Sequence, residues 1–163
     1  MKVLIAIDGS EFSNAVIEEV ARRNWHDGTE FLVLNVVAIP TEQHWQDWGL
    51  GVDPDLIHVL RKEAMSLVEN TVSVLRPQLG LGCSIRSATA EGHASECIVD
   101  TAKIWHADLI MLGSNGAGWL PQFIIGSVAQ RVLLQAPCTV EITRAKKEHK
   151  HEDDASKKRP AAA

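Results

Sequence analysis

Short apolar runs alternate with helix-like segments along most of the chain, and this alternation constrains the fold more than any other feature. Residues 3–7 and 31–39 are apolar runs typical of strands buried on both faces, and three more strands are expected at residues 83–88, 108–112 and 138–142. Between them, apolar residues recur at intervals of three and four, as in amphipathic helices. The order predicts an α/β fold: an open, doubly wound parallel sheet of five strands, with helices on both faces.

The predicted helices carry start and stop signals. Ser10 or Ser13 is a candidate N-cap for the first helix. The stretch Ser127-x-x-Gln130 matches a capping box, with the serine as N-cap of a short helix that ends before Pro137. We expect this helix to be the next element of the chain after the fourth strand.

Length and charge limit the classes of protein to which the chain can belong. Its 163 residues fit one domain, predicted over residues 1–144, and a charged tail, 145–163, that we expect to be disordered. Residues 1–144 carry 10 Lys and Arg against 17 Asp and Glu, and such an acidic body disfavours nucleic-acid binding. No apolar run approaches the ~18 residues of a membrane span. We therefore expect neither a nucleic-acid partner nor a membrane partner.

The cysteines and the N-terminal residues suggest a compartment. Cys83, Cys97 and Cys138 form no CxxC pair, which is typical of free thiols in a reducing environment. The first apolar run ends at Asp8 and is too short for a signal peptide. Both features predict a cytoplasmic location.

A glycine-rich segment after the fourth predicted strand is the strongest site signal in the chain. The pattern G-x2-G-x9-G-[ST] is present as Gly113, Gly116, Gly126 and Ser127. It runs from the carboxyl end of a strand to the start of a helix, where free N–H groups and the helix dipole attract anions. No lysine follows the glycines, so the segment is not a Walker loop. We expect an anion site here.

Three stretches of sequence carry a resemblance to a known family. VLIAIDGSEFSNA at the start, HADLIMLGSNG at the fourth strand and GSVAQRVLLQAPCTVEI at the end resemble the single-domain universal stress proteins. The glycine pattern resembles that of the family's nucleotide-binding branch. The resemblance implies a strand order of 3-2-1-4-5, with a ligand site between the first and fourth strands. It also implies a cytoplasmic stress-response protein that binds an adenine nucleotide, with ATP as the expected ligand.

The resemblance further implies which residues meet the nucleotide. Adenine or ribose would be contacted by Asp8 and by the backbone near Ala6 and Val36. Ribose and the first phosphates would be wrapped by Leu112, Gly113, Asn115 and Gly116. The outer phosphates would meet N–H groups of Gly126, Ser127, Val128 and Ala129. Family members commonly dimerise through the last strand, which here comprises Cys138, Thr139, Val140, Glu141 and Ile142.

Two positions depart from the family pattern. The family often has His or Arg where this chain has Asn115, and Arg or Lys where it has Ala117. Cations that would neutralise a triphosphate are therefore missing, and AMP or a cyclic nucleotide also stays open as the ligand. Mg²⁺ is a candidate cofactor, with Asp8 as its candidate contact. ATP remains the first expectation because the glycine spacing, not the cation, marks the branch.

Two other functions stay open. One is slow ATP hydrolysis or self-phosphorylation, for which the sequence supplies no placed general base or arginine finger. The other is a nucleotide-free dimeric scaffold that acts through protein partners, an interpretation that Asn115 and Ala117 favour.

Two further groups of residues have both a functional and a structural interpretation. Asp8 ends a strand at the expected site, where it either contacts the ligand or caps the next helix. His93 and Cys97 are four residues apart and, with Glu91 nearby, could suit a metal. A core thiol beside a surface histidine is the interpretation that we favour for this second group.

Overall fold

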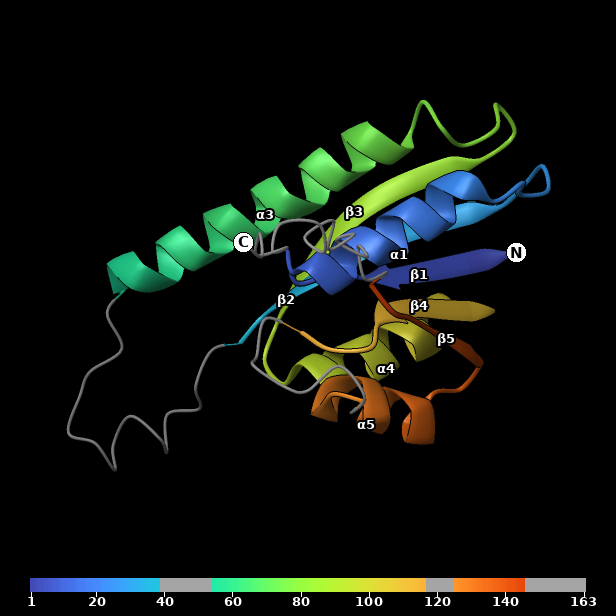
Figure 1. Cartoon of the computed structure of the whole chain (residues 1–163). Helices are drawn as coiled ribbons and strands as arrows, with labels where there is room; N and C mark the ends of the chain where they lie inside the picture. The colour runs from blue at the N-terminus through green and yellow to red at the C-terminus, as the bar shows by residue number, and fades with distance from the viewer. Residues whose placement is uncertain (39–53, 117–124, 146–163) are drawn as a thin grey trace, which may run out of the picture.

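The computed structural model describes residues 1–38, 54–116 and 125–145. Five strands and four helices alternate along these residues (Figure 1). The strands are β1 (Lys2–Ala6), β2 (Glu30–Val37), β3 (Ser84–Glu91), β4 (Leu109–Gly113) and β5 (Thr139–Thr143). The helices are α1 (Glu11–Arg22), α3 (Pro54–Leu75), α4 (Ala94–Trp105) and α5 (Ser127–Gln135). All paired strands are parallel and their order is β3-β2-β1-β4-β5, which confirms the predicted sheet.

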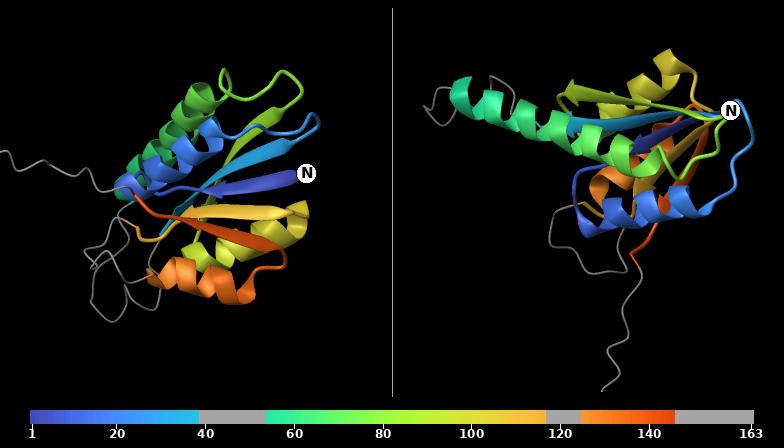
Figure 2. Two further views of the ribbon diagram at one scale, coloured as in Figure 1. Left: turned by 45° about the vertical axis from the view of Figure 1, so that its right-hand side comes forward. Right: turned by 90° about the horizontal axis from the view of Figure 1, so that it is seen from above.

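The sheet separates two hydrophobic cores because successive residues of each strand point to opposite faces. On β1, Val3 and Ile5 join the core under α1 and α3, whereas Leu4 and Ala6 join the core under α4 and α5. Figure 2 shows the two helix pairs on opposite faces of the sheet. Burial on both faces explains why the central strands are continuous apolar runs.

The register of the central strands brings three small or apolar side chains to one edge. Ala6, the last residue of β1, pairs with Leu34 of β2 on one side and Leu112 of β4 on the other. All three belong to the core under α4 and α5. The floor of any site at this edge is therefore apolar.

Several predicted boundaries are corrected by the structure. The third strand is Ser84–Glu91 rather than residues 83–88, because β3 is an edge strand whose outer residues are exposed, so it is not one apolar run. The last strand excludes Cys138 and includes Thr143. The first strand ends before Ile7, and the proposed end of the second at residue 39 lies outside the described residues.

The two cap predictions have different outcomes. Ser10 is the N-cap of α1, and its hydroxyl accepts a hydrogen bond from the N–H of Ser13 at 3.3 Å. The prediction that Ser127 caps α5 is wrong: the N-cap is Gly126, which has extended dihedral angles, and Ser127 is the first helical residue. The shift leaves the start of α5 without a side-chain cap.

In residues 1–38, 54–116 and 125–145, no helix is both long enough and apolar enough to span a membrane. The predicted tail, apart from residue 145, lies outside the described residues.

Candidate nucleotide-binding cavity

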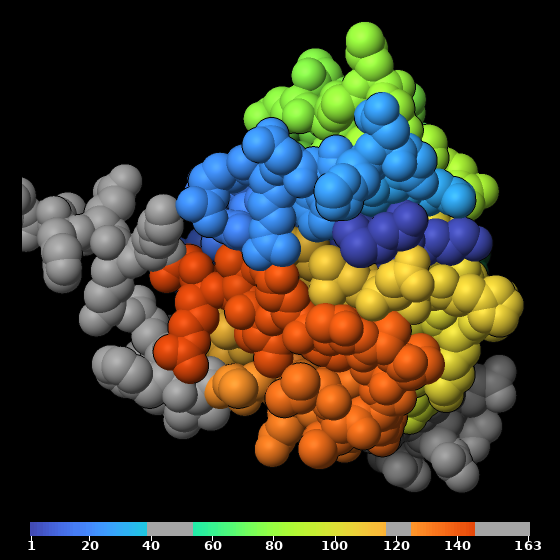
Figure 3. All heavy atoms as spheres, turned by 90° about the vertical axis from the view of Figure 1, so that its right-hand side faces the viewer, coloured from blue at the N-terminus to red at the C-terminus, as the bar shows by residue number. Residues whose placement is uncertain are grey.

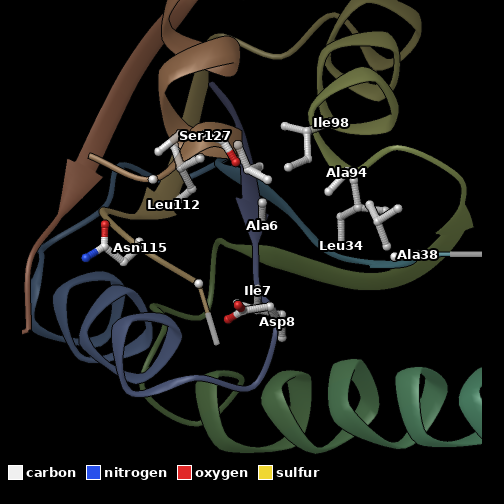
Figure 4. A pocket seen from close by; sticks show the side chains of 16 residues that line it. Ala6, Ile7, Asp8, Leu34, Ala38, Ala94, Ile98, Leu112, Asn115 and Ser127 are labelled. Atoms are coloured by element: carbon white, nitrogen blue, oxygen red, sulfur yellow. The ribbon is translucent and has the colours of Figure 1, made fainter. Parts of the chain in front are cut away.

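A cavity of about 380 Å³ opens at the carboxyl ends of β1, β2 and β4 (Figure 4). We call it the switch-point cavity, because the chain winds in opposite directions on its two sides. It is lined by all the residues that the family resemblance implies for the nucleotide: Ala6, Asp8, Val36, Leu112, Gly113, Asn115, Gly116, Gly126, Ser127, Val128 and Ala129. Segments more than 100 residues apart in the chain thus converge on one hollow of a size usual for small-molecule sites.

Five further lining residues were not identified from the sequence. They are Ile7, Leu34, Ala38, Ala94 and Ile98, which come from the ends of β1 and β2 and from α4. Leu34 could have been found from strand register, because it lies beside Ala6. Ala94 and Ile98 depend on how closely α4 approaches the sheet, and no local sequence signal reports that distance. Together these residues give the cavity an apolar wall that could cover a planar base.

The turn after β1 fixes the position of Asp8. Gly9 has φ +79°, in the left-handed region that favours glycine, and turns the chain toward α1. Asp8 Oδ1 accepts hydrogen bonds from the hydroxyls of Ser10 and Ser13, both at 2.6 Å, and from the Ser10 N–H at 3.1 Å. The Ser13 hydroxyl also accepts the Asp8 N–H at 2.8 Å. One oxygen of Asp8 therefore orders the start of α1, which is part of the structural role that the sequence allowed.

The second oxygen of Asp8 faces the glycine segment. A Cβ placed on Gly116 would stand 2.7 Å from Asp8 Oδ2, closer than real Cβ atoms approach an oxygen. A larger residue at 116 would require the Asp8 carboxylate to shift. This contact brings the two halves of the predicted site together.

The other two glycines of the pattern have different neighbours. A Cβ on Gly113 would lie 2.7 Å from Phe12 Cβ and 3.1 Å from the Phe12 backbone carbon. Gly113 therefore allows α1 to pack tightly on β4. A Cβ on Gly126 would have only ordinary contacts of 3.4–3.5 Å, with Ser114 and Asn115.

Asn115 is buried with unsatisfied hydrogen-bonding groups. The residue lines the cavity and is 6 % exposed. Within the described part of the chain, neither Oδ1 nor Nδ2 has a hydrogen-bond partner, although buried amides in proteins are normally paired. Both atoms are buried behind the cavity wall, so Asn115 meets the cavity through its other atoms.

Two helices begin at the cavity without side-chain caps. Ala94 and Ser127, the first residues of α4 and α5, both line it. Their N-caps, His93 and Gly126, make no side-chain cap hydrogen bond, in contrast to Ser10 of α1. The first N–H groups of a helix need partners, so both starts can donate to an oxygen-rich ligand.

Asp8 is the one ionisable residue among the described residues that line the cavity. In the described part of the chain, no group of three or more His, Cys, Asp and Glu side chains is arranged to hold a metal. A lone carboxylate fits Mg²⁺ only together with oxygens from a phosphate ligand. Any Mg²⁺ contact of Asp8 would therefore depend on a bound nucleotide.

The alternative metal group around Cys97 has other partners. Glu91 forms a two-point ion pair with Arg61, with N–O distances of 2.5 and 2.9 Å, and this lowers the pKa of the carboxyl. The Cys97 thiol donates to the Glu91 carbonyl oxygen at a sulfur–oxygen distance of 3.5 Å. Burial, with Glu96 and Asp100 nearby, raises the pKa of this thiol. These contacts agree with a structural thiol rather than a metal ligand.

The predicted dimer strand lies at the edge of the sheet. Its residues are exposed or half-buried, and Figure 3 shows the β5 segment at the surface between α1 and α5. Glu141 points toward α1, where its carboxylate accepts hydrogen bonds from Arg23 at 2.5 and 2.8 Å. Cys138 precedes the strand, and burial raises the pKa of its thiol.

Comparisons with known proteins identify the family to which this architecture belongs. Residues 1–144 match the model of the Universal stress protein family. Universal stress protein MJ0531 of Methanocaldococcus jannaschii is 28 % identical over 152 residues, which cover 90 % of this chain and 83 % of that protein.

Solved structures show the same fold. The hypothetical protein MJ0577 superimposes with a TM-score of 0.76 at 24 % identity, covering 90 % of this chain and 97 % of that one. A universal stress protein in complex with cAMP gives 0.57 at 16 % identity, covering 90 % and 98 %. An Arabidopsis thaliana family protein, At3g01520, with AMP bound, gives 0.60 at 16 % identity, covering 94 % and 97 %.

Proposed function

The chain belongs to the universal stress protein family, and we propose that it is a stress-response protein that binds an adenine nucleotide in the switch-point cavity. ATP is the first nucleotide to test because of the glycine spacing. One observation carries the proposal: the eleven residues that the family resemblance implies for nucleotide contact all line one cavity. Proteins of this family have been solved with cAMP and with AMP, which supports a ligand of this class.

The two walls of the cavity suit the two ends of a nucleotide. Leu34, Ile98 and Ala38 offer apolar surface for a base, whereas the start of α5 offers N–H groups for a phosphate. Asp8 lies between the two ends, next to Gly116, where it can accept a hydrogen bond from a ribose hydroxyl. When ATP is the ligand, Mg²⁺ would neutralise part of the phosphate charge, with Asp8 as its nearest protein carboxylate.

Calorimetry on ligand-free protein tests the proposal. Purified protein, denatured, cleared of bound nucleotide and refolded, should release or absorb heat on titration with ATP or AMP. The variant Ala94→Phe, which places a ring in the cavity at the first residue of α4, should bind more weakly by at least tenfold. Asp100→Phe is the control on the same helix, because Asp100 is exposed and does not line the cavity. Absence of heat with millimolar ATP, ADP, AMP and cAMP would overturn the proposal.

We also propose that the protein forms a homodimer through β5. The strand TVEIT contains neither lysine nor proline, the residues that commonly protect a sheet edge. Its one charged residue, Glu141, is already paired with Arg23. Analytical ultracentrifugation should give twice the chain mass, and a lysine placed in the edge strand, as in Val140→Lys, should shift the protein toward monomer. A monomeric wild-type protein would contradict this part of the proposal.

A nucleotide-free scaffold is the second candidate, and it is favoured because none of the described lining residues is a cation. It predicts that binding of a protein partner is unchanged in Ala94→Phe. Cytoplasmic location is part of both candidates and is tested by cell fractionation.

A further inference from the structure

Two buried polar side chains lie at the end of β1 without lining the switch-point cavity. Ser13 of α1 is 3 % exposed and Asn35 of β2 is 8 % exposed, whereas the core on this face of the sheet is apolar. Neither residue lines the cavity, and the family resemblance implies neither for the nucleotide. Buried polar side chains are normally hydrogen-bonded, and both of these make hydrogen bonds to Asp8 or to the residue before it.

Ser13 holds Asp8 at two points. Its hydroxyl donates to Asp8 Oδ1 at 2.6 Å and accepts the Asp8 N–H at 2.8 Å, so it fixes the carboxylate and the backbone together. Ser10 also donates to Oδ1, but it is half-buried and lies in the same turn as Asp8. Ser13 instead lies on the buried side of α1, together with Val16 and Val20. It therefore ties Asp8 to a packed helix.

Asn35 fixes the residue before Asp8. Its Nδ2 donates to the Ile7 carbonyl oxygen at 2.8 Å, and the Ile7 N–H donates to the Leu34 carbonyl oxygen at 2.9 Å. These hydrogen bonds continue the attachment of the chain to β2 by one residue beyond Ala6, where β1 ends. The backbone on both sides of the Ile7–Asp8 peptide bond is thus held by buried partners.

These contacts determine which oxygen Asp8 presents to a ligand. Oδ1 receives the hydroxyls of Ser10 and Ser13, and Oδ2 lies on the side of the glycine segment, close to Gly116. Asp8 lines the cavity (Figure 4). Hydrogen bonds weaken steeply when donor and acceptor are misaligned, so a carboxylate that is held at one oxygen offers the other in a defined orientation.

We propose that Ser13 and Asn35 are positioning residues: they hold Asp8 so that Oδ2 accepts a hydrogen bond from a ribose hydroxyl, and they thereby set the preference of the site for ribose over a sugar without hydroxyls. This inference rests on the proposed nucleotide-binding function. Neither residue touches the ligand, and both act through Asp8.

Calorimetry with AMP and with 2′,3′-dideoxy-AMP measures that preference. The wild-type protein should bind AMP about tenfold more tightly, because a hydrogen bond to a charged acceptor is lost with the hydroxyls. In Ser13→Ala and in Asn35→Leu, the two dissociation constants should agree to within about twofold. Ser13→Thr restores the hydroxyl and should recover the preference. A loss of stability alone would weaken both ligands equally, and two variants at different positions keep the test valid if one does not fold.

Thr29→Val is the control. Thr29 is 1 % exposed and its hydroxyl donates to the His26 carbonyl oxygen at 2.7 Å, but it precedes β2 at the opposite end of the sheet from the cavity. The control should keep the wild-type preference for AMP. A wild-type preference in both folded variants, or wild-type protein that binds the two nucleotides equally, would overturn the inference and leave the proposed function intact. If neither nucleotide binds to the wild-type protein, the proposed function fails and the inference fails with it.

Discussion

Asp8 Oδ2 lies 2.7 Å from the position that a Cβ on Gly116 would occupy. The two residues are far apart in the sequence but adjacent at the switch point of the sheet. Because Ser10 and Ser13 hold Oδ1 of the same carboxylate, the side chain cannot turn away without losing those hydrogen bonds. Gly116 therefore keeps the glycine segment against the end of β1, and this contact shapes the cavity.

Replacing Gly116 with alanine tests this contact. Gly116→Ala should destabilise the protein by about 1 kcal/mol, because the Cβ forces the Asp8 carboxylate out of its hydrogen bonds. In an Asp8→Ala background the same substitution should have almost no effect, since the close oxygen is gone. Urea denaturation of the four proteins gives the coupling free energy. An equal loss in both backgrounds would show that the contact is unimportant.

The other two glycines of the pattern should differ in stability. Gly113→Ala should cost about 1–3 kcal/mol, because its Cβ meets the backbone and Cβ of Phe12, which cannot move without shifting α1. Gly126→Ala should cost about 1 kcal/mol at most, since its Cβ has ordinary contacts and the loss is that of a poorer N-cap alone. Thermal and urea unfolding measure both. The reverse order would refute the assignment of Gly113 to helix packing.

Arg23 joins α1 to the edge strand and should give a pH-dependent contribution to stability. It donates to Glu19 and to Glu141, and the hydrogen bonds from Arg22 and Arg23 hold the pKa of Glu19 below its ordinary value of 4.5. Arg23→Gln should lose roughly 1 kcal/mol at neutral pH, because half-exposed pairs contribute little each. A carboxyl with a lowered folded-state pKa stabilises above its unfolded pKa, and this contribution disappears as pH falls through the lowered value.

The difference in unfolding free energy between wild type and Arg23→Gln should therefore be constant above pH 4.5 and shrink below it. Arg86→Gln is a suitable control, because Arg86 has a single exposed partner, Glu30, at 3.9 Å. A difference that grows on acidification would contradict the ion-pair account.

The thiols of Cys97 and Cys138 should be poorly reactive. Burial raises the pKa of both, and Glu96 and Asp108, respectively, add to the effect. Since the thiolate is the reactive form, alkylation at pH 7 should be several-fold slower in the native protein than in urea. Peptide mass mapping after a timed pulse of iodoacetamide gives the rate for each cysteine. Equal native and denatured rates would show that these thiols are accessible and activated.

Much of the fold could be predicted from the sequence because strands buried on both faces produce continuous apolar runs. That signal weakens at the sheet edge: β3 continues to Glu91, beyond the predicted end at Ala88, because its exposed residues interrupt the apolar pattern. The start of α5 was misassigned by one residue. Ser127 matches a capping motif, but Gly126 has the extended conformation of the N-cap.

The part of the candidate site that could be predicted from the sequence is the part formed by motif residues. The glycine pattern and the end of β1 are local signals, and all of them converge on one cavity. The apolar wall from Ala94 and Ile98 was not predictable, because it depends on the packing of α4 against the sheet. The unpaired amide of Asn115 is likewise a property of tertiary burial.

Backbone amide NMR tests the central claim most directly. Uniformly ¹⁵N-labelled protein would be titrated with AMP and, separately, with ATP, and shifts would be mapped onto the described residues. The account predicts that the largest shifts fall on Gly116, Ser127, Val128 and Ala129, which line the cavity. Saturable shifts confined to other surfaces, or no shifts at millimolar nucleotide, would contradict it.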